Sequence, residues 1–204
     1  SSDLMDFKNK TVLITGGASG IGKIMGRKAL ERGAGKLVIC DINEAGMGVM
    51  KEEFAALGAN IFTYKLDVSD WQAVSEISKK IFAEVGVLDI LINNAGIVVG
   101  KFFHEHSHED ILKSIRINSE ALMHLTLEFL PGMMAQNSGA ICNIASAAGL
   151  ISNPKMSVYA ASKWAVVGWS DSLRLEMEQL NKNISVTTVM PFYINTGMFD
   201  GVKR

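Results

Sequence analysis

Short apolar runs alternate with segments of helical periodicity along the whole chain. The runs are rich in β-branched residues and cover residues 11–15, 36–40, 61–66, 88–92, 140–145 and 184–190. Between them, apolar residues spaced three and four apart predict helices over residues 20–33, 43–57, 70–85, 108–136 and 157–181. Six strands separated by helices require parallel pairing with right-handed crossovers. The pattern therefore predicts an α/β fold, a doubly wound parallel sheet of the Rossmann type in three layers.

Composition and charge narrow the class of protein. Of the 204 residues, 48% are hydrophobic and 20% are charged, and the net charge is −1, so nothing favours nucleic acid as a partner. No apolar run approaches the roughly 18 residues of a membrane span, and no signal peptide opens the sequence. We therefore expect a cytoplasmic protein without a membrane span. Residues 5–204 suit one domain, and we interpret residues 1–4 as a leftover of the expression vector.

The first predicted strand ends in a glycine-rich turn, TGGASGIG, at residues 15–22. Gly16, Gly20 and Gly22 fall where a strand passes into a helix, so the backbone can approach a ligand closely there. The free N–H groups and the positive dipole end of the following helix favour a phosphate. The spacing G-x-x-x-G-x-G is a variant of the dinucleotide fingerprint and predicts nucleotide binding.

An acidic residue follows the second predicted strand, about 20 residues beyond the glycines. Asp41 at that position can accept hydrogen bonds from the adenosine ribose hydroxyls and repel a 2′-phosphate. The turn offers no cation at Ala18 or Ser19, so the charges favour NAD, with NADP as the alternative. A second interpretation makes Asp41 a helix cap ahead of Asn43 and Glu44.

Tyr159 and Lys163 are four residues apart in the sequence YAASK, which places both side chains on one face of a predicted helix. A lysine cation about 4 Å from a phenol, at an effective dielectric near 20, favours the phenolate by roughly 4 kcal/mol. That energy corresponds to roughly three pKa units and would bring the tyrosine close to physiological pH. The pair is thus a candidate proton donor and acceptor for alcohol–carbonyl interconversion, although the spacing alone also suits an amphipathic helix with a surface lysine.

Taken in order, these motifs resemble the short-chain dehydrogenase/reductase family over almost the whole chain. The resemblance rests on TGGASGIG, Asp67–Val68, NNAG at residues 93–96, Asn118, Ser146, the Tyr159/Lys163 pair and the segment from Pro191 to Thr196. It implies an oxidoreductase that moves a hydride between a nicotinamide cofactor and a secondary alcohol or ketone. It also implies a homodimer or homotetramer, formed through the helices at 108–136 and 157–181.

The resemblance assigns four catalytic residues. Ser146 would bond the substrate oxygen and stabilise its developing charge, while Tyr159 would move the proton. Lys163 would lower the tyrosine pKa and hold the nicotinamide ribose. Asn118 matches the asparagine that bends its helix and holds a water in a proton relay, and an asparagine inside a helix is otherwise mildly unfavourable.

The resemblance also assigns a set of cofactor contacts. Asp67 would accept from the adenine amino group, the Val68 amide would donate to the ring, and Thr196 would contact the nicotinamide end or the diphosphate. The full set of expected cofactor-binding residues is Gly16, Ser19, Gly20, Ile21, Gly22, Asp41, Asp67, Val68, Asn93, Ala95, Gly96, Tyr159, Lys163, Pro191, Ile194 and Thr196.

Two departures from the family pattern bear on the substrate. The segment PFYINTGMF at 191–199 carries Phe192 where many members have glycine, which resembles the retinol and hydroxysteroid dehydrogenase branch. We therefore expect a hydrophobic, retinol-like, steroid-like or acyl-chain substrate. Family members also continue for about 50 residues with a substrate-covering helix, another helix and a seventh strand. We therefore expect this chain to be C-terminally truncated, with a naturally minimal protein as the alternative.

Alternative functions stay open from the sequence. A 3-oxoacyl-thioester reductase belongs to the same family, and a non-catalytic NAD-sensing scaffold would share the fold, although that scaffold predicts loss of Ser146, Tyr159 or Lys163. A sugar epimerase or dehydratase on a related fold prefers another glycine spacing.

The cysteines and histidines do not indicate a metal site. Cys40 and Cys142 adjoin separate apolar runs, which predicts buried thiols and no disulfide. The histidines in HEHSHED, residues 104–110, alternate with acids before a predicted helix, and Ser107 is a candidate cap. A solvated loop or a lip at the substrate entrance accounts for them better than metal ligation.

Overall fold

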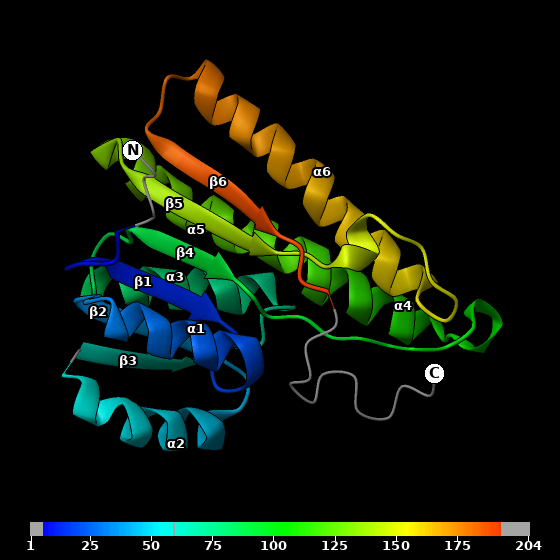
Figure 1. Ribbon diagram of the computed structural model, residues 1–204, viewed down its shortest axis with the longest axis horizontal. Helices are drawn as coiled ribbons and strands as arrows, with labels where there is room; N and C mark the ends of the chain where they lie inside the picture. The colour runs from blue at the N-terminus through cyan, green and yellow to red at the C-terminus, as the bar shows by residue number, and fades with distance from the viewer. Residues whose placement is uncertain (1–5, 59, 193–204) are drawn as a thin grey trace.

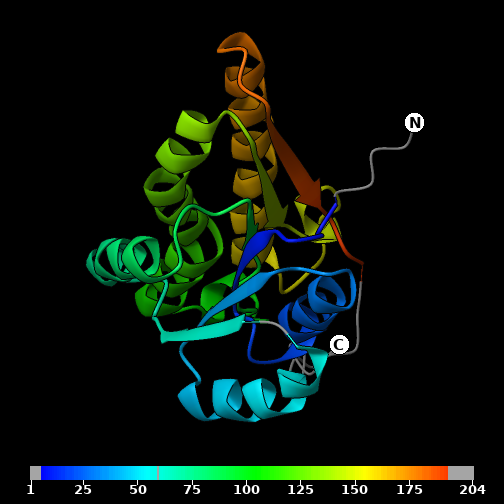
Figure 2. The ribbon, with the colours of Figure 1, turned by 90° about the vertical axis from the view of Figure 1, so that its left-hand side faces the viewer.

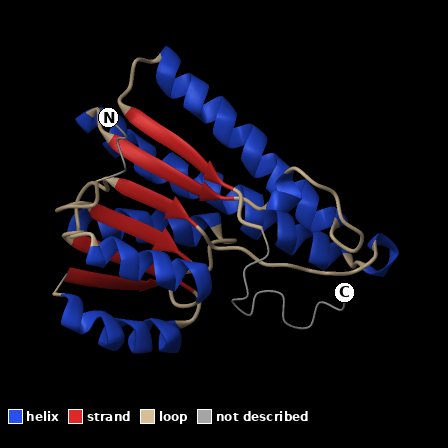
Figure 3. Ribbon diagram, in the orientation of Figure 1, coloured by secondary structure: helices blue, strands red, loops and turns tan. Residues whose placement is uncertain are grey.

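A single parallel sheet organises the molecule. The computed structural model describes residues 6–58 and 60–192. Within this part of the chain the strands are β1 (Thr11–Thr15), β2 (Lys36–Asp41), β3 (Asn60–Lys65), β4 (Ile90–Asn93), β5 (Gly139–Ile144) and β6 (Ile184–Val189). They pair in the order β3-β2-β1-β4-β5-β6, and every pairing is parallel (Figures 1 and 3). The doubly wound sheet predicted from the periodicity is confirmed.

Helices cover both faces of the sheet. The helices are α1 (Gly20–Glu31), α2 (Glu44–Phe54), α3 (Trp71–Glu84), α4 (His108–Ile115), α5 (Ala121–Gln136) and α6 (Ser157–Gln179). Side chains of α1 and α2 belong to one apolar cluster, and side chains of α3, α5 and α6 belong to the other. Figure 2 shows these two layers on opposite sides of the strands.

Alternation along the strands creates the two cores. On β1, Val12 and Ile14 pack toward α1 and α2, whereas Leu13 packs toward α3, α5 and α6, and all three are fully buried. This alternation follows from the two-residue side-chain period of a strand. A central strand buried on both faces therefore has a continuous apolar run, here Val12, Leu13 and Ile14 between two buried threonines.

The predicted helix at 108–136 is interrupted. Residues Arg116–Glu120 form a π-helical turn between α4 and α5, and Asn118 lies inside it. The side chain of Asn118 bonds the backbone of Ile97, outside the helix, with 2.8 Å between Asn118 Oδ1 and Ile97 N. Apolar periodicity does not detect such a turn because spacings of three and four residues continue on either side of it.

Smaller differences concern element ends. β4 begins at Ile90, two residues later than predicted, and the carboxylate of Asp89 before it accepts from the Thr11 backbone and the Lys10 ammonium. α2 ends at Phe54, and the three predicted helical residues after it form a 3₁₀ turn closed by Gly58 at φ +73°. Neither difference moves a residue of the predicted site.

The topology determines where a ligand can bind. The chain crosses from β1 to β2 on one side and from β4 to β5 on the other, so the neighbouring strands β1 and β4 form the switch point. Open α/β sheets bind ligands beyond the carboxyl ends of their strands at this point. Among the described residues, no helix is long and apolar enough to cross a membrane.

Candidate active site

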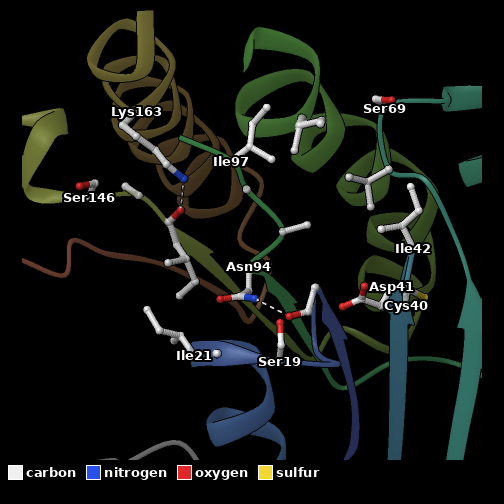
Figure 4. A pocket seen from close by; sticks show the side chains of 18 of the residues that line it. Ser19, Ile21, Cys40, Asp41, Ile42, Ser69, Asn94, Ile97, Ser146 and Lys163 are labelled. Atoms are coloured by element: carbon white, nitrogen blue, oxygen red, sulfur yellow. Dashed lines mark hydrogen bonds between the residues drawn. The ribbon is translucent and has the colours of Figure 1, made fainter. Parts of the chain in front are cut away.

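A cavity of about 630 Å³ opens at the carboxyl end of the sheet, beside the switch point. It lies where the glycine turn after β1, the ends of β2 to β5 and the first turns of α6 come together (Figure 4). The predicted residues that line it are Gly16, Ser19, Gly20, Ile21, Asp41, Asp67, Val68, Ala95, Gly96, Ser146, Tyr159, Lys163 and Pro191. Segments distant in the sequence are thus brought to one site.

The glycine turn provides a cradle that larger residues would fill. Gly16 has φ +65°, and a Cβ at this position would lie 2.9 Å from the Cα of Ala95. At Gly22 a Cβ would lie 2.2 Å from the carbonyl oxygen of Gly16, so α1 packs directly on the turn. The N-terminus of α1, at Gly20, faces the cavity with the free N–H groups that bind phosphate. This cradle fits a dinucleotide.

Asn94 holds the cradle against β4, and sequence reasoning missed it. Its Nδ2 donates to the carbonyl oxygens of Thr15 and Gly16, both at 3.0 Å, and its backbone N–H donates to Thr15 Oγ1 at 3.1 Å. Asn94 lines the cavity (Figure 4), whereas the predicted contact Asn93 does not. Asn93 is the last residue of β4 and its side chain bonds Asn143, whereas Asn94 is the first residue beyond the strand and faces the cavity.

Asp41 is positioned by backbone donors. Its Oδ2 accepts from Ala18 N and its Oδ1 accepts from Asn43 N, each at 2.9 Å. The cap of α2 is Asn43, whose side chain accepts from Gly46 N, so the interpretation of Asp41 as the helix cap is wrong. Each carboxylate oxygen has a second lone-pair site, which leaves Asp41 able to accept from hydroxyl groups in the cavity.

The third-strand motif forms the opposite wall. Asp67 Oδ1 accepts from both the backbone and the hydroxyl of Ser69, at 2.9 and 2.7 Å. Leu66 and Val68 are buried beside it and also line the cavity. The wall therefore combines apolar surface with one fixed carboxylate, which suits an aromatic base with an exocyclic amino group.

Lys163 enters the cavity from α6 as a buried cation. Its Nζ donates to the carbonyl oxygen of Ile144 at 2.9 Å, which Figure 4 shows as a dashed line to β5. The residue is 2% exposed, and burial lowers the pKa of the ammonium to about 8. At neutral pH the group is still mostly protonated, at the cost of desolvation.

Tyr159 lies beside Lys163, 5% exposed, and its hydroxyl shares a hydrogen bond with Ser146. Burial raises the pKa of Tyr159, and the Ser146 hydrogen bond opposes that rise. The pKa of Tyr159 is therefore raised, which contradicts the expectation of a value close to physiological pH, whereas the lowering of this pKa by Lys163 stays a prediction. The ammonium lies over the ring, 5.8 Å from its centroid, and is bonded to Ile144, so desolvation of the phenol dominates.

Asn118 lies near Lys163 without lining the cavity. Its Nδ2 donates to Ile97 O and to Ser162 Oγ, both at 3.0 Å. A Cβ at Gly96 would lie 3.3 Å from Asn118 Oδ1 and 3.5 Å from Lys163 Nζ, so Gly96 separates the two groups. The amide of Asn118 thus connects the π-helical turn to α6, and the relay role stays a prediction.

Several residues of the cavity were not predicted from sequence. These are Cys40, Ile42, Leu66, Ser69, Asn94, Ile97, Lys113, Ile117, Ile144 and Ala145, with Phe192, which the sequence marked only as a departure. Most contribute apolar surface or backbone, and no motif marks such residues. Ile194 and Thr196 lie outside the described residues.

The histidine-rich segment begins α4. Ser107 caps this helix by accepting from Asp110 N at 3.1 Å, and the Asp110 carboxylate accepts from Ser107 N in return, which confirms the predicted cap. In the part of the chain that the structure describes, no three His, Cys, Asp or Glu residues are arranged to hold a metal ion.

Comparison with known proteins identifies the family. Residues 10–204 match the profile of the family described as short chain dehydrogenase. The chain belongs to this short-chain dehydrogenase family. It is 38% identical over 201 residues to short-chain dehydrogenase/reductase family 16C member 6 of Bos taurus, covering 96% of this chain. It is 38% identical over 192 residues to human epidermal retinol dehydrogenase 2, covering 93% of this chain. The chain spans 62% of the length of each of these relatives.

A solved family structure agrees in fold. The crystal structure of a short chain dehydrogenase/reductase from Burkholderia phymatum in complex with NAD superimposes with a TM-score of 0.92 at 31% sequence identity. The match covers 97% of this chain and 70% of that one. This structure shows that a member of similar fold binds NAD.

Proposed function

We propose that this protein is an NAD-dependent oxidoreductase that interconverts a secondary alcohol and a ketone. The observation that carries the proposal is the convergence of Ser146, Tyr159 and Lys163 on the same cavity as the dinucleotide cradle. Family membership supports it, and so does a relative of similar fold in complex with NAD. A scaffold that only senses NAD would not need a buried lysine beside a tyrosine and a serine.

In this proposal the chain's own residues control one proton. Bound NAD would supply or accept the hydride. Tyr159, kept protonated by its raised pKa, donates to the substrate carbonyl oxygen during reduction, while the Ser146 hydroxyl donates a second hydrogen bond to the same oxygen. Lys163 places a positive charge over the tyrosine ring, and this charge favours the phenolate that forms as the proton leaves.

The raised pKa of Tyr159 bears on which way its proton can move. Oxidation of an alcohol needs the phenolate as base, and burial disfavours that anion. We therefore propose that, in the protein without substrate, Tyr159 is a proton donor at pH 7.

The substrate we propose is a hydrophobic alcohol or ketone. Phe192 lines the cavity at 79% exposure, and Leu150 and Ile151 follow Ser146 at 53% and 58% exposure. An exposed apolar side chain in the cavity, with two more in the segment after Ser146, suits an apolar substrate. The names of relatives, epidermal retinol dehydrogenase 2 and estradiol 17-beta-dehydrogenase 11, point to the same substrate class.

We further propose NAD as the preferred cofactor. The carboxylate of Asp41 lines the cavity and is held there by two backbone amides. A fixed negative charge at this point repels the 2′-phosphate of NADP and accepts hydrogen bonds from the hydroxyls of NAD.

A homodimer or homotetramer is the assembly we propose. Helices α4, α5 and α6 carry exposed apolar side chains, among them Leu112, Leu127 and Trp164 at 52%, 69% and 50% exposure. Burial of such residues between copies would stabilise an assembly. Size-exclusion chromatography with light scattering measures the assembly, and a monomer at micromolar concentration would contradict the proposal.

The test of function is turnover. The protein is mixed with NADH or NADPH and a panel of retinal-like, steroid and 3-oxoacyl-thioester carbonyl compounds, and the absorbance of the reduced cofactor is followed. We expect turnover of a retinoid or steroid with NADH and a loss of at least about 100-fold in Ser146→Ala. Binding of NADH without turnover of any compound would favour the sensing scaffold, and preferential turnover of a thioester would favour the reductase alternative.

A further inference from the structure

A line of buried side-chain hydrogen bonds runs beneath the catalytic cavity. Asn93 Nδ2 on β4 donates to Asn143 Oδ1 on β5 at 2.8 Å, and Asn143 Nδ2 donates to Ser170 Oγ on α6 at 2.9 Å. Asn93, Asn143 and Ser170 are 4%, 0% and 1% exposed. Of the three, none lines the cavity. They therefore act on the site through other residues.

The line joins the same two elements that the catalytic lysine joins. Asn143 directly precedes Ile144, whose carbonyl oxygen accepts from Lys163 Nζ. Ser170 follows Lys163 by seven residues, which is about two helical turns, so both lie on the same face of α6. β5 and α6 are thus hydrogen-bonded through side chains at two points, one catalytic and one buried below it.

The other contacts on this face of α6 are apolar and less directional. Val166, Leu173 and Met177 are buried between Lys163 and the end of the helix. The hydrophobic attraction of these side chains has no preferred direction of its own. The hydrogen bond to Ser170 depends on the rotation and the height of the helix, because a slip of α6 by one residue, about 1.5 Å and 100°, would separate Asn143 Nδ2 from Ser170 Oγ.

The turn of α6 from Tyr159 to Lys163, which we call the catalytic turn, is also hydrogen-bonded to the π-helical segment. Ser162 precedes Lys163 and is fully buried, and its backbone carbonyl accepts from Ser119 Oγ at 3.0 Å. Its hydroxyl accepts from Asn118 Nδ2 at 3.0 Å and donates to Tyr159 O at 2.6 Å. These bonds hold the catalytic turn to the π-helical segment but leave the height of α6 on β5 undetermined.

We propose that Asn143 and Ser170 are positioning residues that fix the rotation and height of α6 on β5. They thereby hold Lys163 against the Ile144 carbonyl and Tyr159 against Ser146. The expected effect of Asn143 and Ser170 on turnover rests on the proposed function, since they would support the same proton transfer. Their effect on the position of residues 157–166 can be measured without any turnover.

The test compares two substitutions on one helix face. Ser170→Ala removes the hydroxyl that pairs with Asn143, and Leu173→Ala, the matched control, removes apolar volume three residues further on, where the side chain is 6% exposed. Ser170→Thr keeps the hydroxyl. For each variant, thermal unfolding, kcat with its pH profile, and hydrogen exchange of the backbone amides in 157–166 are measured.

In Ser170→Ala we expect kcat to fall at least about fivefold and the midpoint of its pH profile to shift. We also expect the backbone amides in 157–166 to exchange about tenfold faster. In Leu173→Ala we expect an equal or larger loss of Tm, with kcat within about twofold of the original protein. Ser170→Thr should recover most of the turnover.

The outcomes separate this inference from the proposed function. If the unsubstituted protein turns over no substrate, the proposed function fails, and faster exchange in Ser170→Ala alone still supports the positioning role. If Ser170→Ala and Leu173→Ala change kcat and exchange only in proportion to their loss of Tm, Ser170 is a structural residue and the inference is wrong.

Discussion

Replacement of Lys163 by methionine is expected to stabilise the fold at neutral pH while it abolishes turnover. Lys163 is 2% exposed, and its ammonium is held by one carbonyl oxygen, that of Ile144. Methionine keeps a long flexible side chain of similar volume and removes the charge. The experiment therefore isolates the cost of burying this cation.

The pKa gives the size of the effect. Burial lowers the pKa of Lys163 from 10.5 to about 8, and at about 1.36 kcal/mol per pKa unit this corresponds to about 3 kcal/mol at pH 7. Leaving the Ile144 carbonyl without its donor costs about 1–3 kcal/mol in the variant. We therefore expect Lys163→Met to be more stable than the original protein at pH 7 by about 0–2 kcal/mol.

The pH dependence is the sharper signature. Between pH 8 and 10.5 the unfolded lysine binds more protons than the folded one, so the stability of the original protein rises with pH in this window. The variant lacks this rise, and its advantage falls by about 2 kcal/mol between pH 7 and 9.5. Urea unfolding of both proteins at the two pH values measures the change. An advantage that does not vary with pH would refute the burial argument.

Three further predictions concern the cofactor cradle and the core. In Gly22→Ala the new Cβ would lie 2.2 Å from Gly16 O, so the affinity for NADH should fall at least about 100-fold in a fluorescence titration. The control is Gly48→Ala, whose new Cβ would have no atom within 4 Å, and this variant should bind NADH with the original affinity. Asp41→Asn removes the fixed charge, and the ratio of NADPH to NADH affinity should rise at least about tenfold; an unchanged ratio would overturn the role of Asp41. Burial raises the pKa of the Cys40 thiol to about 12, so mass spectrometry should find it unmodified after iodoacetamide treatment of the folded protein at pH 8, and rapid alkylation would show that it is accessible.

The sheet could be predicted almost completely because its signals are local and repeated. Each strand is a short apolar run, and β1 matches its predicted bounds, Thr11–Thr15. The glycine turn and the Tyr159/Lys163 pair were identified because their chemistry requires particular residue types at fixed spacings. Motifs of this kind can therefore be recognised from the sequence alone.

What could not be predicted depends on burial and on tertiary partners. Tyr159 has a raised pKa because neighbours from several elements exclude water, and sequence spacing reports only the nearby lysine. The choice between Asn93 and Asn94 depends on tertiary partners, because Asn93 at the end of β4 bonds Asn143, whereas Asn94 just beyond the strand bonds the carbonyl oxygens of Thr15 and Gly16. The π-helical turn at Asn118 arises from bonds to Ile97, 21 residues away in the sequence.

The central claim is that Tyr159 transfers the proton in a cavity that also binds NAD. The most direct test is Tyr159→Phe, which removes one oxygen and keeps the buried ring. We expect turnover of any accepted ketone to fall at least about 1,000-fold, while NADH binds within about threefold of the original affinity. Full turnover by Tyr159→Phe on an accepted substrate would contradict the central claim.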